Sequence, residues 1–145
     1  KRQMIDRLYE ASQAGVEIDL IVRGICCLIP GQKYSRNIRV TRIVDTFLEH
    51  ARIWYFGNGG NPKLFLGSPD WMRRNLYRRI EAVTPILDPD AKQELIDMLS
   101  IQLSDKRKAC FVDENLHNCW KSAHPLKEKV RSQYTFYEYL KEKIE

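Results

Sequence analysis

The sequence predicts an α/β fold in which helices flank a mixed β-sheet. Near the start of the chain, apolar or small residues recur at helical spacing across residues 2–14, and Gly15 ends the pattern. Residues 16–24 follow with an almost unbroken apolar run, as in a buried strand. A helix joined by a short turn to a buried strand is typical of α/β proteins.

The remaining chain continues this alternation of strand and helix patterns. Further strands are expected at residues 51–56, 63–66, 80–86 and 109–115, and further helices at residues 71–77, at residues 88–103 and at the C-terminal end. The turn residues GNGGNP join the first two of these strands, which predicts a hairpin. Asp88 and Asp90 are the N-cap candidates of the long helix. Residues 38–50 are expected to begin extended and to become helical near Thr41, with His50 at the helix end.

Length and composition are those of an ordinary globular domain. The 145 residues are 43% hydrophobic and 30% charged, which is enough to bury a core. No apolar run approaches the roughly 20 residues that a membrane-spanning helix needs. The chain begins without Met, in a pattern that resembles a helix already under way. We therefore expect residues 1–145 to form a single domain excised from a larger multidomain protein.

The four cysteines indicate a reducing compartment. They are too sparse for a disulfide framework and form no CxxC pair, so we expect a cytoplasmic protein, with association at a membrane surface left open. Cys26 and Cys27 follow the first strand and are expected in the core. The less favoured alternative is a zinc site made from Cys110, Cys119, His117 and His124. Irregular spacing argues against that site, and we expect no metal ligand in this chain.

Positive charge is concentrated in one part of the sequence. Residues 23–79 contain nine Arg and two Lys against three acidic residues, a net charge of +8, while the rest of the chain carries −3. Arginine predominates there, and its planar guanidinium suits the recognition of phosphate oxygens. A solvated basic surface is the ordinary alternative for such a run. The clustering favours an anionic ligand.

Arg23 stands at the end of the first predicted strand. In α/β proteins, functional side chains lie at the carboxyl ends of strands and in the loops that follow. Gly24 comes next and would let the backbone pass close to a ligand. Arg23 is therefore a candidate anion-binding residue, and pairing with a nearby carboxylate is an alternative of equal weight.

His50 and Arg52 form the second candidate group. Near neutral pH, a histidine can give a proton to a leaving oxygen or take one from an attacking oxygen. A lone histidine is more often structural, yet residues two apart in a strand point to the same face. If the strand reaches back to His50, imidazole and guanidinium share one side, which fits a phosphate better than an apolar core.

The segment GSPDWMRRNLYRR, residues 67–79, holds the third group. Ser68 and the glycine before it offer a small turn whose hydroxyl and backbone amides suit a phosphate oxygen. Asp70 is expected either to cap the following helical turn or to orient the histidine or an arginine. Arg73 and Arg74 lie on that turn and complete the candidate phosphate-binding set.

Three more charged residues follow this set. Arg78 and Arg79 point in opposite directions if extended, so at most one of them is expected to face the site. Glu81 lies two residues from Arg79 and is expected to hold it in place.

Three long blocks of the sequence carry a family resemblance. They are YEASQAGVEIDLIVRGICCLIPG, IRVTRIVDTFLEHARIWYFGNGG and GSPDWMRRNLYRRIEAVTPI. Together they resemble the C-terminal catalytic domain of polyphosphate kinases, the ATP–polyphosphate phosphotransferases, strongly over residues 8–88 and more loosely beyond. The resemblance implies a phospholipase-D-like α/β fold, the second of two such domains that face each other across a tunnel.

The resemblance also implies roles for individual residues. His50 matches the family's second histidine, a group that contacts nucleotide phosphates and assists transfer as an acid–base, and Arg23 matches an arginine that contacts ATP. His50 with Arg52, and the GSPD of residues 67–70, resemble a degenerate phospholipase-D pattern in which Lys normally stands at the Arg52 position. The histidine that becomes phosphorylated and the Mg²⁺-binding residues would lie in the first domain, outside this chain.

The leading hypothesis is therefore a polyphosphate kinase fragment, inactive alone, that binds ATP or ADP and inorganic polyphosphate beside the remaining domains of the same enzyme. Transfer of the ATP γ-phosphate needs alignment and charge compensation more than covalent help at phosphorus. The full-length enzyme is expected to be a homo-oligomer. Two alternatives are a phospholipase-D-like phosphodiesterase acting as a symmetric pair and a basic module for polyanions or nucleic acid, although base-stacking aromatics are not evident on the basic face.

Overall fold

The computed structural model describes residues 1–144, which divide into two compact units. The smaller unit contains Lys1 and Leu48–Asp97, and the larger unit contains Arg2–Phe47 and the chain from Met98 onward. Glu145, which the expected single domain and terminal helix include, lies outside the described residues. The single-domain expectation stays a prediction.

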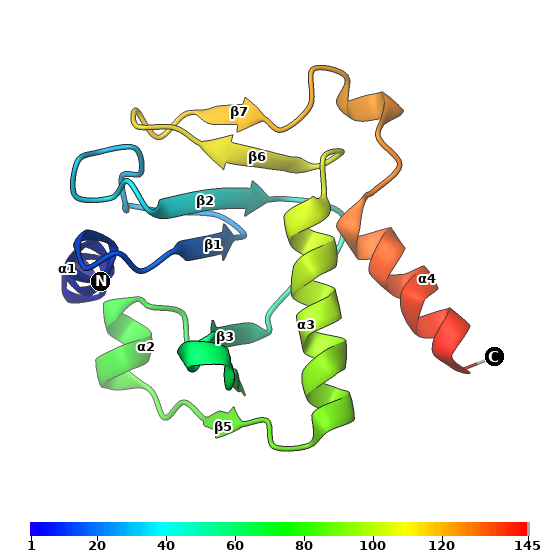
Figure 1. Cartoon of the computed structure of the whole chain (residues 1–145), viewed down its shortest axis with the longest axis horizontal. Helices are drawn as coiled ribbons and strands as arrows, with labels where there is room; N and C mark the ends of the chain where they lie inside the picture. The colour runs from blue at the N-terminus through cyan, green and yellow to red at the C-terminus, as the bar shows by residue number, and fades with distance from the viewer. Residues whose placement is uncertain (145) are drawn as a thin grey trace. The chain divides into compact units, whose positions relative to one another are not determined.

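The larger unit is built on a mixed sheet with strand order β1–β2–β6–β7 (Figure 1). Its strands are β1 (Ile18–Val22), β2 (Ile38–Ile43), β6 (Ala109–Val112) and β7 (Asn118–Trp120). β1 and β2 run parallel, whereas β2 with β6 and β6 with β7 are antiparallel. Its other elements are α1 (Arg2–Gln13), the 3₁₀ turn η2 (Pro125–Lys127) and α4 (Ser132–Ile144).

The core of the larger unit joins α1 to the central strands. Four residues, each at most 4% exposed, form the buried cluster: Leu28, Ile38, Val40 and Val112. From α1, Ile5, Leu8 and Tyr9 pack against this cluster. These three side chains are partly buried, so each contributes less than the roughly 1.5–3 kcal/mol of full burial, and together they dock the amphipathic face of α1 on the sheet.

The smaller unit is built on an antiparallel sheet with strand order β3–β4–β5. Its strands are β3 (Arg52–Phe56), β4 (Lys63–Gly67) and β5 (Val83–Pro85), with η1 (Asn58–Gly60) inside the hairpin turn and α2 (Arg73–Arg78) after β4. Arg52 lies opposite Gly67 in the hairpin register. Helix α3 (Pro89–Ser104) begins in this unit, where Asp88 Oδ1 accepts a hydrogen bond from the Ala91 N–H at 2.8 Å, as an N-cap should.

The α/β fold class is confirmed, and most expected elements appear within a few residues of their predicted bounds. The sequence did not predict that the strands divide between two sheets, and it missed β7. Cys26 packs against the core cluster as expected. Cys27 is an exposed free thiol, so its expected place in the core is wrong.

The helix expected in residues 38–50 is wrong. Residues 38–43 form β2, and residues 44–51 have neither helix nor strand. β2 is paired on both sides, by β1 and β6, so within residues 41–43 sheet pairing overrides the local helical pattern. In the segment after β2, Val44, Phe47 and Leu48 are 63%, 60% and 77% exposed.

None of the described helices is long and apolar enough to cross a membrane.

Gly67 is the glycine of the smaller unit at which an added side chain would have least room. A Cβ there would lie 2.6 Å from the Ala82 carbonyl oxygen and 2.9 Å from Val83 Cγ2. Backbone of the paired strand can move little, so we expect Gly67→Ala to destabilise the chain by about 1–3 kcal/mol. Urea-induced unfolding followed by the fluorescence of the nearby Trp54 would measure the change in the free energy of unfolding.

The matched control is Gly57→Ala. A Cβ at Gly57 meets nothing within 4 Å, and the residue already has helical φ and ψ of −62° and −30°. Its stability should therefore be unchanged or slightly raised. Equal stability of the Gly67→Ala and Gly57→Ala proteins would contradict the close approach at Gly67.

Candidate phosphate-binding site

An ion pair between Arg52 and Asp70 lies at the start of β3. Arg52 Nε donates to Asp70 Oδ1 at 2.9 Å, and Arg52 Nη2 lies 2.8 Å from the same oxygen. The two side chains are only 17% and 23% exposed, so water screens the pair less than it would on an open surface. Of the two roles expected for Asp70, the structure therefore supports orientation of an arginine.

The same guanidinium group also holds the backbone on both sides of His50. Arg52 Nη1 donates to the carbonyl oxygen of Glu49 at 3.2 Å and to that of Ala51 at 3.1 Å. β3 begins at Arg52, so strand register does not reach back to His50. The link between the two residues runs instead through these carbonyl groups. His50 is exposed. The carbonyl groups on both sides of it accept hydrogen bonds from the Arg52 guanidinium, which Asp70 holds in turn.

Ser68 and Glu81 form the second polar cluster of the smaller unit. The Ser68 hydroxyl donates to Glu81 Oε2, and Asn75 Nδ2 donates to Glu81 Oε1 at 2.8 Å. The Ser68 N–H donates to the Ala82 carbonyl at 3.3 Å, so this amide is engaged in the sheet rather than pointing to a ligand. Asn75, at 5% exposure, is the buried residue of α2.

Glu81 has a lowered pKa. The Ser68 hydroxyl is the largest cause, the Asn75 amide follows, and the charges of Arg79 and His50 add smaller contributions. The expectation that Glu81 serves to hold Arg79 is thus only partly right, because its hydrogen bonds go to Ser68 and Asn75. Sequence reasoning missed the role of Asn75. A neutral amide among four arginines was the available signal, and it was weak.

The remaining predicted site residues are exposed arginines. Arg73 and Arg74 open α2 in the smaller unit. Arg23 follows β1 and belongs to the larger unit. Within the smaller unit, then, the structure brings His50, Arg52 and Asp70 into one connected group. An exposed imidazole on a fixed backbone can exchange a proton, and exposed guanidiniums can bind anionic oxygens.

Comparison with known proteins decides the family. The family model described as polyphosphate kinase C-terminal domain 2 matches residues 1–133. The chain belongs to this family. It is 59% identical over 108 residues to a polyphosphate kinase of Synechocystis sp., covering 74% of this chain and 15% of that protein. It is 47% identical over 139 residues to the polyphosphate kinase of Escherichia coli K12, covering 95% of this chain and 20% of that protein.

A solved structure agrees with the family assignment. The fold matches the crystal structure of a polyphosphate kinase from Porphyromonas gingivalis with a TM-score of 0.93 and 56% sequence identity. The match covers 99% of this chain and 22% of that one. The phospholipase-D-like α/β class expected from the sequence is therefore confirmed. The chain spans about a fifth of the length of these polyphosphate kinases.

Residues 1–144 do not fit a Mg²⁺ site of their own. Within this part of the chain, no group of three or more His, Cys, Asp or Glu side chains is placed to hold a metal ion. Two carboxylates of the smaller unit are already engaged, Asp70 with Arg52 and Glu81 with Ser68 and Asn75.

The lowered pKa of Glu81 predicts an acid-sensitive contribution to stability. The stabilisation is fully present above the pKa of Glu in the unfolded chain, about 4.3, and is lost as pH falls through the lower folded value. Glu81→Gln should therefore lower stability at pH 7 and lose less stability between about pH 5 and pH 3 than the unsubstituted chain does. Urea-unfolding midpoints measured across that range would test both effects.

Ser68→Ala is the companion variant, because it removes the largest cause of the pKa shift and leaves the carboxylate. Its loss of stability on acidification should fall between those of the unsubstituted chain and Glu81→Gln. Identical pH profiles for all three proteins would contradict the coupling of Ser68 to Glu81.

Proposed function

We propose that this chain is part of a polyphosphate kinase and takes part in the reversible transfer of the ATP γ-phosphate to inorganic polyphosphate. The observation that carries the proposal is the 47% identity to a named polyphosphate kinase over 95% of the chain. The connected group of His50, Arg52 and Asp70 supplies chemistry suited to that reaction. Because the chain is about a fifth of such an enzyme, it would be inactive by itself.

His50 is the proposed acid–base residue. When the bond between the γ-phosphorus and the bridging oxygen breaks, the oxygen leaves with ADP and carries negative charge. The His50 imidazole donates a proton to that oxygen, and in the reverse direction it takes the proton back. The acceptor of the phosphoryl group is the end of the polyphosphate chain or a histidine elsewhere in the full-length enzyme, which would form a phosphohistidine.

The arginines divide into two kinds of role. Arg23, Arg73 and Arg74 are exposed and would contact phosphate oxygens of ATP or polyphosphate. Arg52 is half-buried and engaged with Asp70 and two carbonyl groups, so it would act mainly by holding the backbone around His50. Ser68 would contribute through its bond to Glu81.

The remaining partners follow from the same proposal. Mg²⁺, bound with ATP, would take its protein ligands from the rest of the enzyme and would neutralise phosphate charge there. The other domains of the same polypeptide would complete the site. We expect the full-length protein to be a cytoplasmic homo-oligomer. A phospholipase-D-like phosphodiesterase and a nucleic-acid-binding module are not favoured, because the named relatives are polyphosphate kinases.

Replacement of the proposed acid–base residue tests its role directly. In the full-length enzyme, His50→Ala should lower the rate of polyphosphate synthesis by about 10²–10⁴-fold, the range that a general acid–base group contributes. The side chain is exposed, so the melting temperature should change little. His124→Ala, a substitution of another exposed histidine, is the matched control and should retain the rate. Parallel losses of rate and melting temperature in His50→Ala would instead indicate a structural residue.

The isolated chain offers a second test. We expect it to bind polyphosphate weakly, with an affinity that falls steeply with salt, as for other polyanions bound by basic surfaces. We expect no useful turnover of ATP, because the rest of the enzyme is missing. Titration with fluorescent polyphosphate at several salt concentrations would measure the first expectation. ATP-dependent polymer synthesis by the isolated chain would contradict the second.

A further inference from the structure

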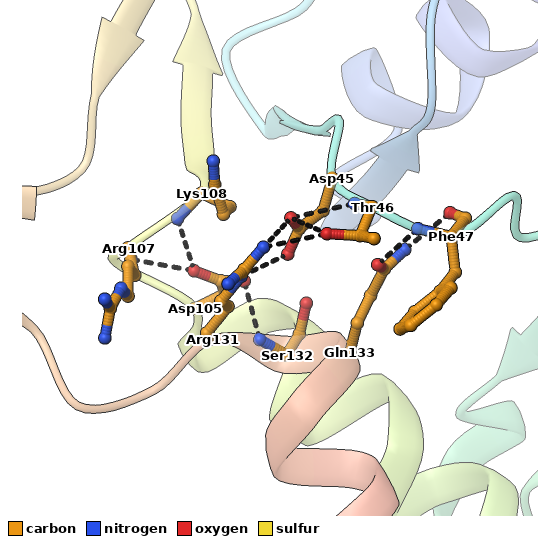
Figure 2. Close-up of polar contacts among 9 residues, drawn as sticks. All are labelled: Asp45, Thr46, Phe47, Asp105, Arg107, Lys108, Arg131, Ser132 and Gln133. Carbon is orange, nitrogen blue, oxygen red and sulfur yellow. Dashed lines mark hydrogen bonds and ion pairs between the residues drawn. The ribbon is translucent and has the colours of Figure 1, made fainter. Parts of the chain in front are cut away.

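Polar contacts in the larger unit hold the chain just before it reaches His50. Figure 2 shows Asp45, Thr46 and Phe47, which follow β2, meeting the start of α4 at Arg131 and Gln133. We call these five residues the α4 latch. They come from segments 86 positions apart in sequence, as the Asp45–Arg131 pair illustrates. The latch therefore joins a loop to a helix that is distant from it in sequence, a contact that the local sequence pattern does not predict.

The first part of the latch is a two-point ion pair. Arg131 Nε donates to Asp45 Oδ2 at 2.9 Å, and Arg131 Nη2 donates to Asp45 Oδ1 at 2.6 Å and to Thr46 Oγ1 at 2.9 Å. The Asp45 side chain is 1% exposed and that of Arg131 is 26% exposed. The hydrogen bond from Arg131 is the main reason that the pKa of Asp45 is lowered. A planar guanidinium in this geometry fixes both position and orientation.

The second part of the latch is a backbone clamp. Gln133 Oε1 accepts from the Phe47 N–H at 2.8 Å, and Gln133 Nε2 donates to the Phe47 carbonyl at 2.7 Å. The carboxamide thus satisfies both backbone groups of one residue, as a neighbouring strand would. The Phe47 ring also lies 5.9 Å from the Tyr134 ring, centroid to centroid. The residue is 60% exposed, so directed hydrogen bonds rather than burial hold Phe47 in place.

The start of α4 is itself anchored. Asp105 has no exposed surface, and its Oδ2 accepts from the Ser132 N–H at 2.8 Å (Figure 2). Its other oxygen accepts from the N–H groups of Arg107 and Lys108, both at 2.8 Å. Because this buried carboxylate ties the first residue of α4 to the turn before β6, the latch acts from a fixed point.

The latch lies in the irregular segment that leads to His50. Residues 44–51 contain no helix or strand, and their apolar side chains are largely exposed, so packing does not determine their path. Phe47 ends this stretch of the larger unit, and only Leu48 and Glu49 separate it from His50. A displacement of Phe47 can therefore pass along two residues to the proposed acid–base group.

We propose that Arg131 and Gln133 are positioning residues for phosphoryl transfer, which fix residues 45–47 and thereby the placement of His50. The proposal rests on the function proposed above. Neither residue is assigned a contact with ATP or polyphosphate. They act through the main chain, as residues that restrict a reactive group to its productive geometry do.

The test uses the full-length enzyme that contains this chain. In Gln133→Ala, kcat for polyphosphate synthesis should fall by about tenfold or more, since misplacement of a catalytic group by 1 Å can cost about 10²-fold. The KM for ATP should stay within about threefold, because no binding group is removed. Gln133→Glu keeps the acceptor for the Phe47 N–H and loses the donor, so its kcat should lie between those of Gln133→Ala and the unsubstituted enzyme.

Arg131 has a matched control on the surface of the same unit. Arg39 also makes two hydrogen bonds to one carboxylate, that of Asp19, at 2.7 Å and 3.0 Å. The Arg39 side chain is 59% exposed, and it lies on β2 rather than beside residues 45–47. Lys retains the charge and loses the two-point geometry. Arg131→Lys should lower kcat several-fold, whereas Arg39→Lys should leave it unchanged.

A readout independent of turnover is the hydrogen exchange of the Phe47 amide. This exchange should become at least several-fold faster in Gln133→Ala, while the core amides of β2 and the melting temperature stay close to those of the unsubstituted enzyme. Faster exchange with lowered kcat and near-constant KM supports the proposal. Unchanged kcat, or a loss of kcat that only follows the fraction of unfolded protein, overturns it.

The proposed function and the positioning role are tested by different outcomes. If the unsubstituted enzyme does not transfer phosphate from ATP to polyphosphate, the proposed function is wrong, whatever the variants do. If the unsubstituted enzyme is active and Gln133→Ala and Arg131→Lys are equally active, the positioning role alone is wrong.

Discussion

The half-buried ion pair between Arg52 and Asp70 is the interaction on which the candidate site depends. One guanidinium group meets Asp70 and the carbonyl groups on both sides of His50. Removal of Asp70 would leave a positive charge without its partner in a poorly hydrated place, which costs more than an exposed pair contributes. An exposed histidine in an irregular segment thus obtains a defined backbone without any helix or strand of its own.

The arginines of the chain fall into two classes. Some are paired with carboxylates and hold the local structure, and others are exposed, where an anionic ligand can reach them. Arg52 and Arg131 are partly buried against Asp70 and Asp45. Arg73 and Arg74 keep their side chains exposed at the start of α2. A count of arginines in the sequence gives the net charge of the region but does not separate these two classes, because the difference lies in burial and in partners distant along the chain.

The sequence predicted the fold class, the hairpin, the long helix with Asp88 at its N-cap and the family resemblance, since each depends on local pattern or on long matched blocks. It did not predict that residues 41–43 complete a central strand, because pairing with β1 and β6 decides that segment. It also did not predict that no helix follows this strand. The hydrogen bonds of Asn75 to Glu81 and of Gln133 to Phe47 could not be predicted from the sequence either. Their partners lie 6 and 86 positions away, and a single amide residue carries no spacing signal.

The structure of the full-length enzyme bound to a non-hydrolysable ATP analogue would test most directly whether this group handles phosphoanhydride oxygens. We expect a His50 ring nitrogen within about 3 Å of an oxygen of the β- or γ-phosphate, the distance of a hydrogen bond. Arg52 should remain on Asp70, and exposed arginines of this chain should contact the phosphates. Phosphates bound far from His50, with its imidazole turned to another partner, would contradict the assignment.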